Sequence, residues 1–225
     1  MAENQPHQPT NRPHRILIVD DHPIVRHGLT ELIARQSDLE VCGDASNSAD
    51  ALRQIEADPP DLAIIDISLE GENGLELIKQ VKSRWPQVRI LVSSMHDETV
   101  YAPRAFQAGA QGYLSKQESI RKMIDAVRQI LRDEVYLTPR MANRLLRNLA
   151  HGESLERNPM DSLTNRELQV FELVGQGHNT PQIARMLEMS PRTVETHRKH
   201  IKKKLGLANS MELNRAAFLW VQGNR

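Results

Sequence analysis

The chain has 225 residues, of which 39% are hydrophobic and 26% are charged, a globular composition with enough length for two domains. No apolar run approaches the roughly 18 to 20 residues of a membrane span, so no membrane partner is expected. The net charge is zero, but residues 161–225 carry ten Lys and Arg against six Asp and Glu. That part therefore has a net charge of +4 and residues 1–160 have −4, which suggests an anionic partner for the C-terminal part.

Residues 1–13 lack the apolar core of a signal peptide and are rich in Gln, Asn and Pro, so we expect a disordered tail. Cys42 is the single cysteine, which excludes a disulfide within the chain. Cys42 lies in a strand-like run, where a small buried side chain is the simplest interpretation. A reducing cytoplasm is the expected location.

Short apolar runs alternate with helical patterns over residues 14–131. Strands are predicted at Ile16–Val19, Leu39–Cys42, Leu62–Ile65, Ile90–Val92 and Gly112–Ser115. Helices are predicted at Pro23–Arg35, Ser48–Ala57, Asn73–Trp85, Glu98–Ala108 and Ser119–Leu131. This alternation predicts an α/β fold of flavodoxin-like type, with a five-stranded, doubly wound parallel sheet. Because Pro103 stands in the middle of the fourth helix, we expect that helix to begin late or to be kinked.

Polar side chains stand at the ends of four of these predicted strands. Asp20 and Asp21 follow the first strand, and Asp66 follows the third. Ser94 comes directly after the fourth, and Lys116 directly after the fifth. Any one of them alone is most simply a residue that begins a loop. Together they predict an acidic site, because the carboxyl ends of parallel strands meet at the edge where ligands bind.

Three carboxylates held close together repel one another, so a proton or a cation must compensate them. An oxygen-only set with no His or Cys nearby favours Mg²⁺. Lys116 adds a positive charge that suits a phosphoryl group. These groups support attack of the Asp66 carboxylate on a phosphoryl donor to give an aspartyl phosphate, with Ser94 donating a hydrogen bond.

The order and spacing of Asp20, Asp21, Asp66, Ser94 and Lys116 resemble the active site of a response-regulator receiver domain, and the resemblance covers residues 14–131. It implies that Asp66 is the phosphoacceptor and that Ser94 and Lys116 assist it. It further implies that Ser94 and Tyr113 are switch residues. The implied Mg²⁺ ligands are Asp20, Asp21, Asp66 and the backbone carbonyl of Ser68.

Two other classes of protein remain open at this point. A magnesium-dependent phosphatase or phosphotransferase acting through Asp66 usually has a second aspartate two residues further on, where this chain has Ser68. An interaction module whose receiver is never phosphorylated is the other alternative. The acidic pair, the serine and the lysine argue against it.

Residues 132–160 are a predicted linker. Thr138 followed by Pro139 predicts a capped helix over Met141–Ala150, and residues 152–159 read as a flexible tether.

Residues 161–225 predict a small all-α domain of four helices. The first opens with a capping box from Thr164 to Glu167, and the second spans Pro181–Glu188. The third runs from Ser190 to Leu205 before Gly206, and the fourth spans Ser210–Val221. The short turn between the second and third helices indicates a helix-turn-helix.

The third helix has an apolar face and a polar face. At about 100° per residue, Val194, Ile201 and Leu205 lie on one side and are expected to face the core. The opposite side carries long cations and short hydrogen-bonding groups, namely Arg192, Glu195, Thr196, Lys199 and Lys203. Such a face suits phosphates and base edges in a major groove. An ordinary solvated face is the alternative, and the preceding turn and the positive charge favour DNA.

Several motifs in this part resemble the LuxR-type DNA-binding module, namely Leu163-Thr164, Glu167, Ile183-Ala184, Thr193-Val194, His197 and Lys204-Leu205-Gly206. A receiver followed by this module is the NarL/FixJ arrangement. The resemblance implies a bacterial transcription regulator that a sensor histidine kinase phosphorylates, with no enzymatic activity beyond self-phosphorylation and autodephosphorylation at Asp66. Its implied partner is double-stranded DNA, with His197 added to the contacting residues, and RNA polymerase is a further candidate.

We also expect a homodimer when the protein is phosphorylated or bound to DNA. The fourth helix carries Leu213, Ala217 and Trp220, more apolar side chains than a small domain needs to cover itself. Our hypothesis is that its outer edge pairs two DNA-binding domains. An equal alternative is that Trp220 belongs to the core.

Overall fold

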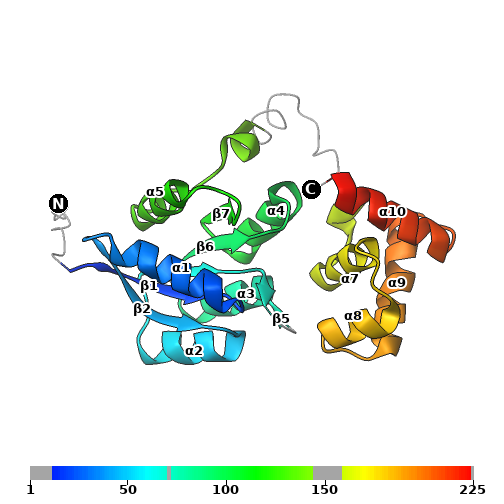
Figure 1. Cartoon of the computed structure of the whole chain (residues 1–225), viewed down its shortest axis with the longest axis horizontal. Helices are drawn as coiled ribbons and strands as arrows, with labels where there is room; N and C mark the ends of the chain where they lie inside the picture. Colours follow the sequence, from blue (N-terminus) through cyan, green and yellow to red (C-terminus); the bar gives the residue numbers. More distant parts are fainter. Residues whose placement is uncertain (1–11, 70–71, 144–158, 224–225) are drawn as a thin grey trace, which may run out of the picture.

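The computed structural model describes residues 12–69, 72–143 and 159–223. An α/β unit is followed by a separate group of helices that packs beside it (Figure 1). Most of the predicted N-terminal tail and of the predicted linker, residues 1–11 and 144–158, lies outside the described residues. No helix within the described ranges is long and apolar enough to cross a membrane.

The predicted five-stranded parallel sheet is confirmed. Its strands have the order β2-β1-β3-β6-β7, and every neighbouring pair is parallel. The strands are β1 (His14–Val19), β2 (Leu39–Ala45), β3 (Leu62–Ile65), β6 (Arg89–Ser94) and β7 (Gly112–Ser115). The central strands β1, β3 and β6 are nearly all buried, which explains why they read as continuous apolar runs.

Helices cover both faces of this sheet. One face packs against α1 (Pro23–Ala34) and α5 (Ile120–Leu131), and the other packs against α2 (Ser48–Ala57), α3 (Gly74–Arg84) and α4 (Glu98–Ala108). Successive strand residues point to opposite faces, so Ile16 and Ile18 join the first core and Leu17 and Val19 join the second. The doubly wound architecture is thus confirmed, and it directs the carboxyl ends of the strands toward the helical unit (Figure 1).

The expectation that the fourth helix begins late is wrong. Helix α4 is assigned continuously over Glu98–Ala108 with Pro103 inside it. Asp97 caps its start by accepting a hydrogen bond of 2.6 Å from the Thr99 backbone amide, and Gly109 ends it in the left-handed conformation. Both caps and the burial of one face, including Val100 and Ala105, stabilise this helix despite the proline.

A short hairpin follows β3, with two residues in each strand, and it was not predicted. Its strands, β4 (Ser68–Leu69) and β5 (Glu72–Asn73), pair antiparallel directly after Asp66. Strands this short have no hydrophobic period, so the sequence has no signal for them. Gly74 closes the hairpin and donates a backbone hydrogen bond of 2.9 Å to the Ile67 carbonyl.

The start of the linker helix agrees with its prediction. Helical structure begins at Pro139 and continues to Asn143, where the described residues stop. The Thr138 hydroxyl accepts a hydrogen bond of 3.3 Å from the Met141 amide and donates one of 2.8 Å to Glu98. The remainder of this predicted helix and the predicted tether up to residue 158 lie outside the described part.

The helical unit contains the four predicted helices and one additional short 3₁₀ helix. Its elements are η1 (Pro159–Ser162), α7 (Asn165–Gly175), α8 (Thr180–Met186), α9 (Pro191–Leu205) and α10 (Ser210–Gly223). The capping box is present, since the Thr164 and Glu167 side chains each accept from the other's backbone amide. Gly206 ends α9 with a φ of 67°, as the helix-stop signal predicts.

The core of this unit also includes Trp220. Val194 and Ile201 of α9 are fully buried and Leu205 is partly buried, which confirms the predicted inner face. Trp220 is half-buried, and its ring lies 5.8 Å from that of Phe171. The alternative that Trp220 serves the core is therefore the better one. The large apolar side chains that α10 exposes are Met211, Phe218 and Leu219.

Candidate phosphorylation site and nucleic-acid interface

The sheet brings the predicted acidic residues and the lysine together at one edge. Asp20 and Asp66 stand at the ends of the adjacent strands β1 and β3, and Lys116 follows β7. The Lys116 Nζ atom lies 2.6 Å from a carboxylate oxygen of Asp20 and 2.6 Å from one of Asp66. The lysine thus compensates two carboxylates that are themselves almost completely buried.

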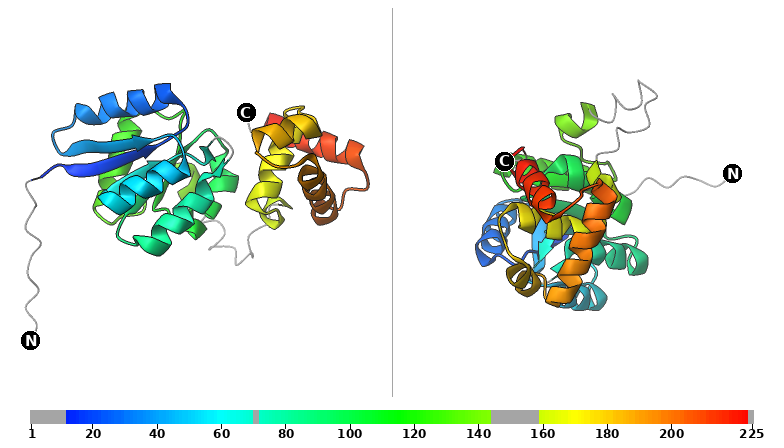
Figure 2. Two further views of the ribbon diagram at one scale, coloured as in Figure 1. Left: turned by 90° about the horizontal axis from the view of Figure 1, so that it is seen from below. Right: turned by 90° about the vertical axis from the view of Figure 1, so that its right-hand side faces the viewer.

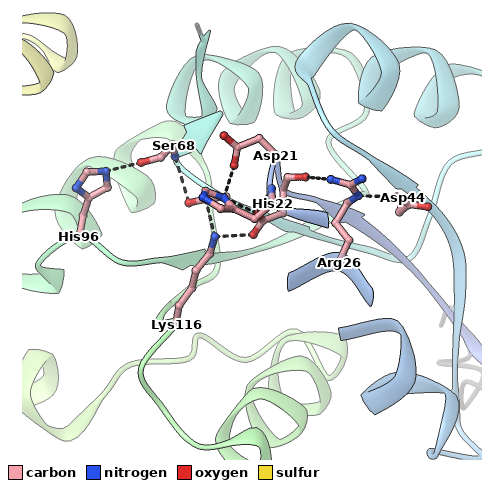
Figure 3. Close-up of polar contacts among 9 residues, drawn as sticks. Asp21, His22, Arg26, Asp44, Ser68, His96 and Lys116 are labelled. Carbon is pink, nitrogen blue, oxygen red and sulfur yellow. Dashed lines mark hydrogen bonds and ion pairs between the residues drawn. The ribbon is translucent and has the colours of Figure 1, made fainter. Parts of the chain in front are cut away.

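The expectation of a site without histidine is wrong. His22 directly follows the acidic pair, and its Nδ1 atom lies 2.6 Å from Asp21 Oδ1 (Figure 3). Ligand atoms of Asp20, Asp21, His22 and Asp66 all lie within 4.8 Å of one another. The set therefore consists of three carboxylates and one exposed imidazole.

These residues fit a hard divalent cation. Asp20 Oδ2 and Asp21 Oδ1 are buried and have no hydrogen bond within the described ranges. Asp20 Oδ2 lies 2.6 Å from Lys116 Nζ, and Asp21 Oδ1 lies 2.6 Å from His22 Nδ1. Carboxylate oxygens with free lone pairs are the ligands that Mg²⁺ prefers.

Asp66 is positioned by its backbone and by its neighbours. Its amide donates to the Val19 carbonyl at 2.8 Å, and its Oδ1 atom accepts from the Ser68 amide at 3.1 Å. Burial raises the pKa of the Asp66 carboxyl above its ordinary value, and the hydrogen bond from Lys116 counteracts only part of this. Burial lowers the pKa of Lys116, but Asp20 and Asp66 outweigh it, so that pKa is raised. A cation bound here would favour the ionised form of Asp66.

The two predicted switch residues lie on neighbouring strands behind this edge. Ser94 ends β6 and is fully buried, and Tyr113 lies in β7 with 2% of its surface exposed. The Tyr113 hydroxyl donates a hydrogen bond of 2.8 Å to the backbone carbonyl of His96. Burial raises the pKa of Tyr113 far above its ordinary value, so this hydroxyl remains a neutral donor.

His96 connects this edge to the helical unit, a role that the sequence did not reveal. Its Nε2 atom lies 2.6 Å from the Ser68 hydroxyl, and its Nδ1 atom lies 3.2 Å from Glu172 Oε1 on α7. Its ring stacks on that of Tyr101 at 4.3 Å. Burial lowers the pKa of His96, but Glu172 outweighs this effect and the pKa is raised.

Helix α4 makes further contacts with the helical unit. The Tyr101 hydroxyl donates a hydrogen bond of 2.8 Å to Glu172 Oε2. The Arg104 guanidinium donates to the Asn165 side chain at 2.9 Å and to the Met160 carbonyl at 2.7 Å. Residues more than 50 positions apart in the chain form these bonds, so no local pattern could predict them.

A cavity of about 410 Å³ lies between the two units. Asp21, Ser68 and His96 line it on the side of the sheet. Glu172 of α7 and Gln176, the C-cap residue of that helix, line it on the other side. Helices α7 and α8 therefore form a wall next to the acidic edge.

The predicted recognition face lies on the far side of the helical unit. Arg192, Glu195, Thr196, Lys199 and Lys203 of α9 are all exposed. Figures 1 and 2 both place α7 between α9 and the sheet. Contact between the two units therefore leaves this face uncovered.

Two of the residues predicted to contact DNA already interact with, or are covered by, other parts of the protein. Glu195 accepts a hydrogen bond of 2.5 Å from the Thr180 hydroxyl at the start of α8. His197 is half-buried, and its Nδ1 atom is buried. Burial lowers the pKa of His197, so the imidazole is held toward its neutral form.

The protein has a parallel sheet with an acidic carboxyl edge, and this sheet is joined to a helix-turn-helix unit with a basic outer face. This combination defines a two-domain, DNA-binding regulator. The response regulator receiver domain family matches residues 16–128, and the bacterial regulatory proteins of the luxR family match residues 161–217. The chain therefore belongs to the response regulators with a LuxR-type DNA-binding domain. This confirms the predicted family, which consists of transcription regulators rather than typical enzymes.

Relatives with established names support this assignment. The chain is 32% identical to the response regulator GacA of Pseudomonas aeruginosa over 199 residues. This alignment covers 88% of the present chain and 92% of GacA. It is also 32% identical over 204 residues to the oxygen regulatory protein NreC of Staphylococcus carnosus, covering 88% and 94% of the two chains.

Solved structures have the same fold. One of them is a LuxR-family two-component response regulator from Aurantimonas, with a TM-score of 0.58 and 32% sequence identity. The superposition covers 62% of the present chain and 99% of the Aurantimonas chain. RcsB of Salmonella enterica, bound to promoter rprA with the phosphomimetic BeF₃⁻, matches 91% and 98% with a TM-score of 0.64 and 23% identity. Receiver domains in general bind Mg²⁺ at an acidic pocket, and this chain has a cluster of Asp20, Asp21, His22 and Asp66 at the carboxyl edge of its sheet.

Proposed function

We propose that Asp66 accepts a phosphoryl group from a sensor histidine kinase, and that this step controls sequence-specific binding of double-stranded DNA by α9 and thereby transcription. The observation that carries the proposal is the position of Lys116, whose ammonium lies 2.6 Å from Asp20 and 2.6 Å from Asp66. In the reaction an Asp66 oxygen bonds to phosphorus while the bond from phosphorus to the donor imidazole nitrogen breaks. The imidazole leaves with the electron pair and then takes up a proton.

The neighbouring residues have distinct proposed roles in this reaction. The Lys116 ammonium leaves Asp66 and forms an ion pair with a phosphoryl oxygen. The Ser94 hydroxyl donates a hydrogen bond to a second phosphoryl oxygen. Asp20, Asp21, Asp66 and the Ser68 carbonyl would hold Mg²⁺, whose positive charge would neutralise the phosphoryl oxygens. Tyr113 and Ser94 would move together when the phosphoryl group arrives.

We assign the receiver domain to residues 14–131, the linker to 132–160 and the DNA-binding domain to 161–225. We further propose a homodimer on DNA. The exposed side chains Met211, Phe218 and Leu219 of α10 suit such pairing, because apolar groups gain free energy when they leave water. Two paired domains would read a two-fold symmetric operator with half-sites about one helical turn apart. We also propose that the protein acts in the bacterial cytoplasm and contacts RNA polymerase there.

The central test is phosphorylation of the full chain by acetyl phosphate in the presence of MgCl₂. We expect the protein to gain the mass of one phosphoryl group, and we expect EDTA to prevent this gain. The same samples should differ in their affinity for DNA selected from a random pool. A mass gain that EDTA leaves unchanged would contradict the magnesium assignment.

Replacement of Lys203 by Ala should weaken binding to all DNA sequences alike. Lys203 is exposed on α9, and its ammonium suits a phosphate contact. Removal of one such contact should reduce the slope of log affinity against log salt concentration by about one unit. Titrations of specific and random duplexes at several salt concentrations measure this slope. A loss confined to the specific duplex would assign Lys203 to base reading instead.

Glu195→Ala should relax the preference for one base pair in each half-site. A carboxylate in the negative major groove is tolerated when it accepts a hydrogen bond, and cytosine N4 is the donor that suits it. The expected cost on the preferred sequence is about 1 to 3 kcal/mol. Because Glu195 accepts from Thr180 in the structure, Thr180→Ala is the control that removes this bond alone. Identical selected motifs for wild type and Glu195→Ala would assign base reading to Thr196 and Lys199.

A further inference from the structure

We propose that Arg26 is a positioning residue for the magnesium site. Its guanidinium holds the backbone carbonyl of Asp20 and thereby fixes the direction in which Asp20 and Asp21 present their carboxylates. This inference rests on the proposed function, in which these two aspartates hold Mg²⁺. Arg26 lies in α1 and is not one of the proposed ligands, so it would act on the cation through the chain that carries them.

The Asp20 carbonyl needs a donor from outside the sheet. Strand β1 ends at Val19 and β2 ends at Ala45, and the Asp20 amide still donates to the Ala45 carbonyl at 3.1 Å. In a longer parallel ladder the Asp20 carbonyl would accept from an amide further along the partner strand, but β2 does not reach that far. The Arg26 Nη1 atom takes this place and donates to the Asp20 carbonyl at 2.7 Å.

The Arg26 side chain is itself held in position. Its Nε atom donates to Asp44 Oδ2 at 2.7 Å, and Figure 3 shows the Arg26 guanidinium facing Asp44. The Asp44 backbone is anchored in turn, since its carbonyl accepts a hydrogen bond of 2.8 Å from the Gln54 side chain on α2. The Arg26 side chain is 18% exposed, which leaves it little freedom to turn into water. A planar guanidinium presents its donors in a fixed fork, and this fork suits two acceptors at once.

A fixed carbonyl at Asp20 orients both aspartates. The carbonyl of Asp20 and the amide of Asp21 belong to one planar peptide unit, so a donor to the carbonyl limits the rotation of the chain between them. The Asp20 carboxylate also accepts a hydrogen bond of 2.9 Å from the His22 amide, which follows in the same turn. Loss of Arg26 would free this turn. Partners that orient metal ligands in this way typically contribute about 10- to 100-fold to metal affinity.

The positive charge of Arg26 has the opposite effect on a bound cation. A guanidinium near the site repels Mg²⁺, so removal of this charge by itself would raise the affinity. The Asp44 carboxylate offsets this repulsion, because it lies 2.7 Å from the guanidinium. Positioning and repulsion therefore predict opposite signs for the same substitution, and a binding measurement separates them.

The test measures binding of divalent cations to the unphosphorylated full chain. Mn²⁺ is the probe, since the electron paramagnetic resonance signal of free Mn²⁺ gives the amount bound, and MgCl₂ is then added to displace it. We expect Arg26→Ala to weaken Mg²⁺ binding about tenfold or more. Arg26→Lys keeps the charge but lacks the fork, so we expect a smaller loss. The matched control is Arg53→Ala, which removes an exposed guanidinium that pairs with Asp50 within α2 and should leave Mg²⁺ binding unchanged.

Phosphorylation by acetyl phosphate at increasing MgCl₂ concentrations separates positioning from a general structural defect. For Arg26→Ala, the MgCl₂ concentration that gives the half-maximal rate should rise about tenfold or more. The rate at saturating MgCl₂ should stay close to that of the wild type, because Asp66 and Lys116 keep their contact. Urea unfolding checks that each variant is folded. A lower maximal rate with an unchanged Mg²⁺ affinity would overturn the proposal.

The other failures can be told apart. Mg²⁺ binding by Arg26→Ala that equals or exceeds that of the wild type refutes positioning, and so does an equal loss in Arg53→Ala. If Arg26→Ala does not fold, Arg26→Lys decides in its place, and wild-type affinity in that variant refutes the proposal. If the wild type binds both cations but takes up no phosphoryl group, the proposed function fails while the titrations still decide the role of Arg26. If the wild type binds neither cation, the magnesium site and this inference fail together.

Discussion

Asp66→Asn should abolish the mass gain of the full chain with acetyl phosphate and magnesium. An amide nitrogen and a neutral carbonyl cannot replace the carboxylate as nucleophile, and the Lys116 ion pair of 2.6 Å would lose one of its two partners. The amide fills the same volume, so we expect the sheet to remain intact. Intact-protein mass spectrometry measures the result, and circular dichroism checks the fold.

The matched control is Asp125→Asn, which removes an exposed carboxylate from α5 of the same domain. This variant should be phosphorylated at the rate of the wild type. Asp66→Asn should also lose the difference in DNA affinity between treated and untreated protein. A full mass gain in Asp66→Asn would show that another residue is the phosphoacceptor and would overturn the proposed function.

Gly74→Ala should both destabilise the receiver and slow its phosphorylation. A Cβ atom at this position would lie 2.1 Å from the backbone oxygen of Asp66 and 2.8 Å from the Ile67 Cα atom. Backbone atoms cannot rotate away, so the chain that holds the phosphoacceptor must shift. We expect a loss of about 1 to 3 kcal/mol in the free energy of unfolding, as for other overpacked sites. Misplacement of Asp66 should lower the phosphorylation rate about tenfold or more.

Gly28→Ala provides the opposite case. Gly28 lies in the middle of α1 and is exposed. Apart from its chain neighbours and the backbone of its own helix, no atom of the described residues lies within 4 Å of the position of an added Cβ. Here the change should stabilise the protein by about 0.5 to 1 kcal/mol, since alanine favours a helix more than glycine does. Urea unfolding compares the two variants. Equal stability of Gly74→Ala and the wild type would contradict the contact with Asp66.

The composition of the phosphorylation site could be predicted because it depends on local patterns. Apolar runs identified the strands, and the residues that follow each run had to meet at one edge once the strands were parallel. Asp20, Asp66 and Lys116 were found in this way, and the structure brings them together. The inner face of α9 followed from its helical period in the same manner, since Val194 and Ile201 are buried.

Other features depended on balances that a local pattern does not contain. Pro103 disfavours a helix, but the caps and the buried face of α4 outweigh that local cost. His22 was overlooked as a neighbour of the carboxylates, although it follows Asp21 directly. Only the turn after β1 decides that its ring points back to the acidic pair.

Local patterns were sufficient to predict the two kinds of unit, the strands and helices within them, and the residues that meet at the acidic edge. These are encoded in hydrophobic periods, caps and turns that span a few residues each. The way in which the two units face each other does not follow from any local pattern and is seen only in the folded chain. Glu172 meets His96 and Tyr101 because α7 packs against the receiver, a contact between residues about 70 positions apart. Complementary shape and charge determine which distant residues pack together. Such contacts have no repeating pattern in the sequence, so they could not be predicted from it.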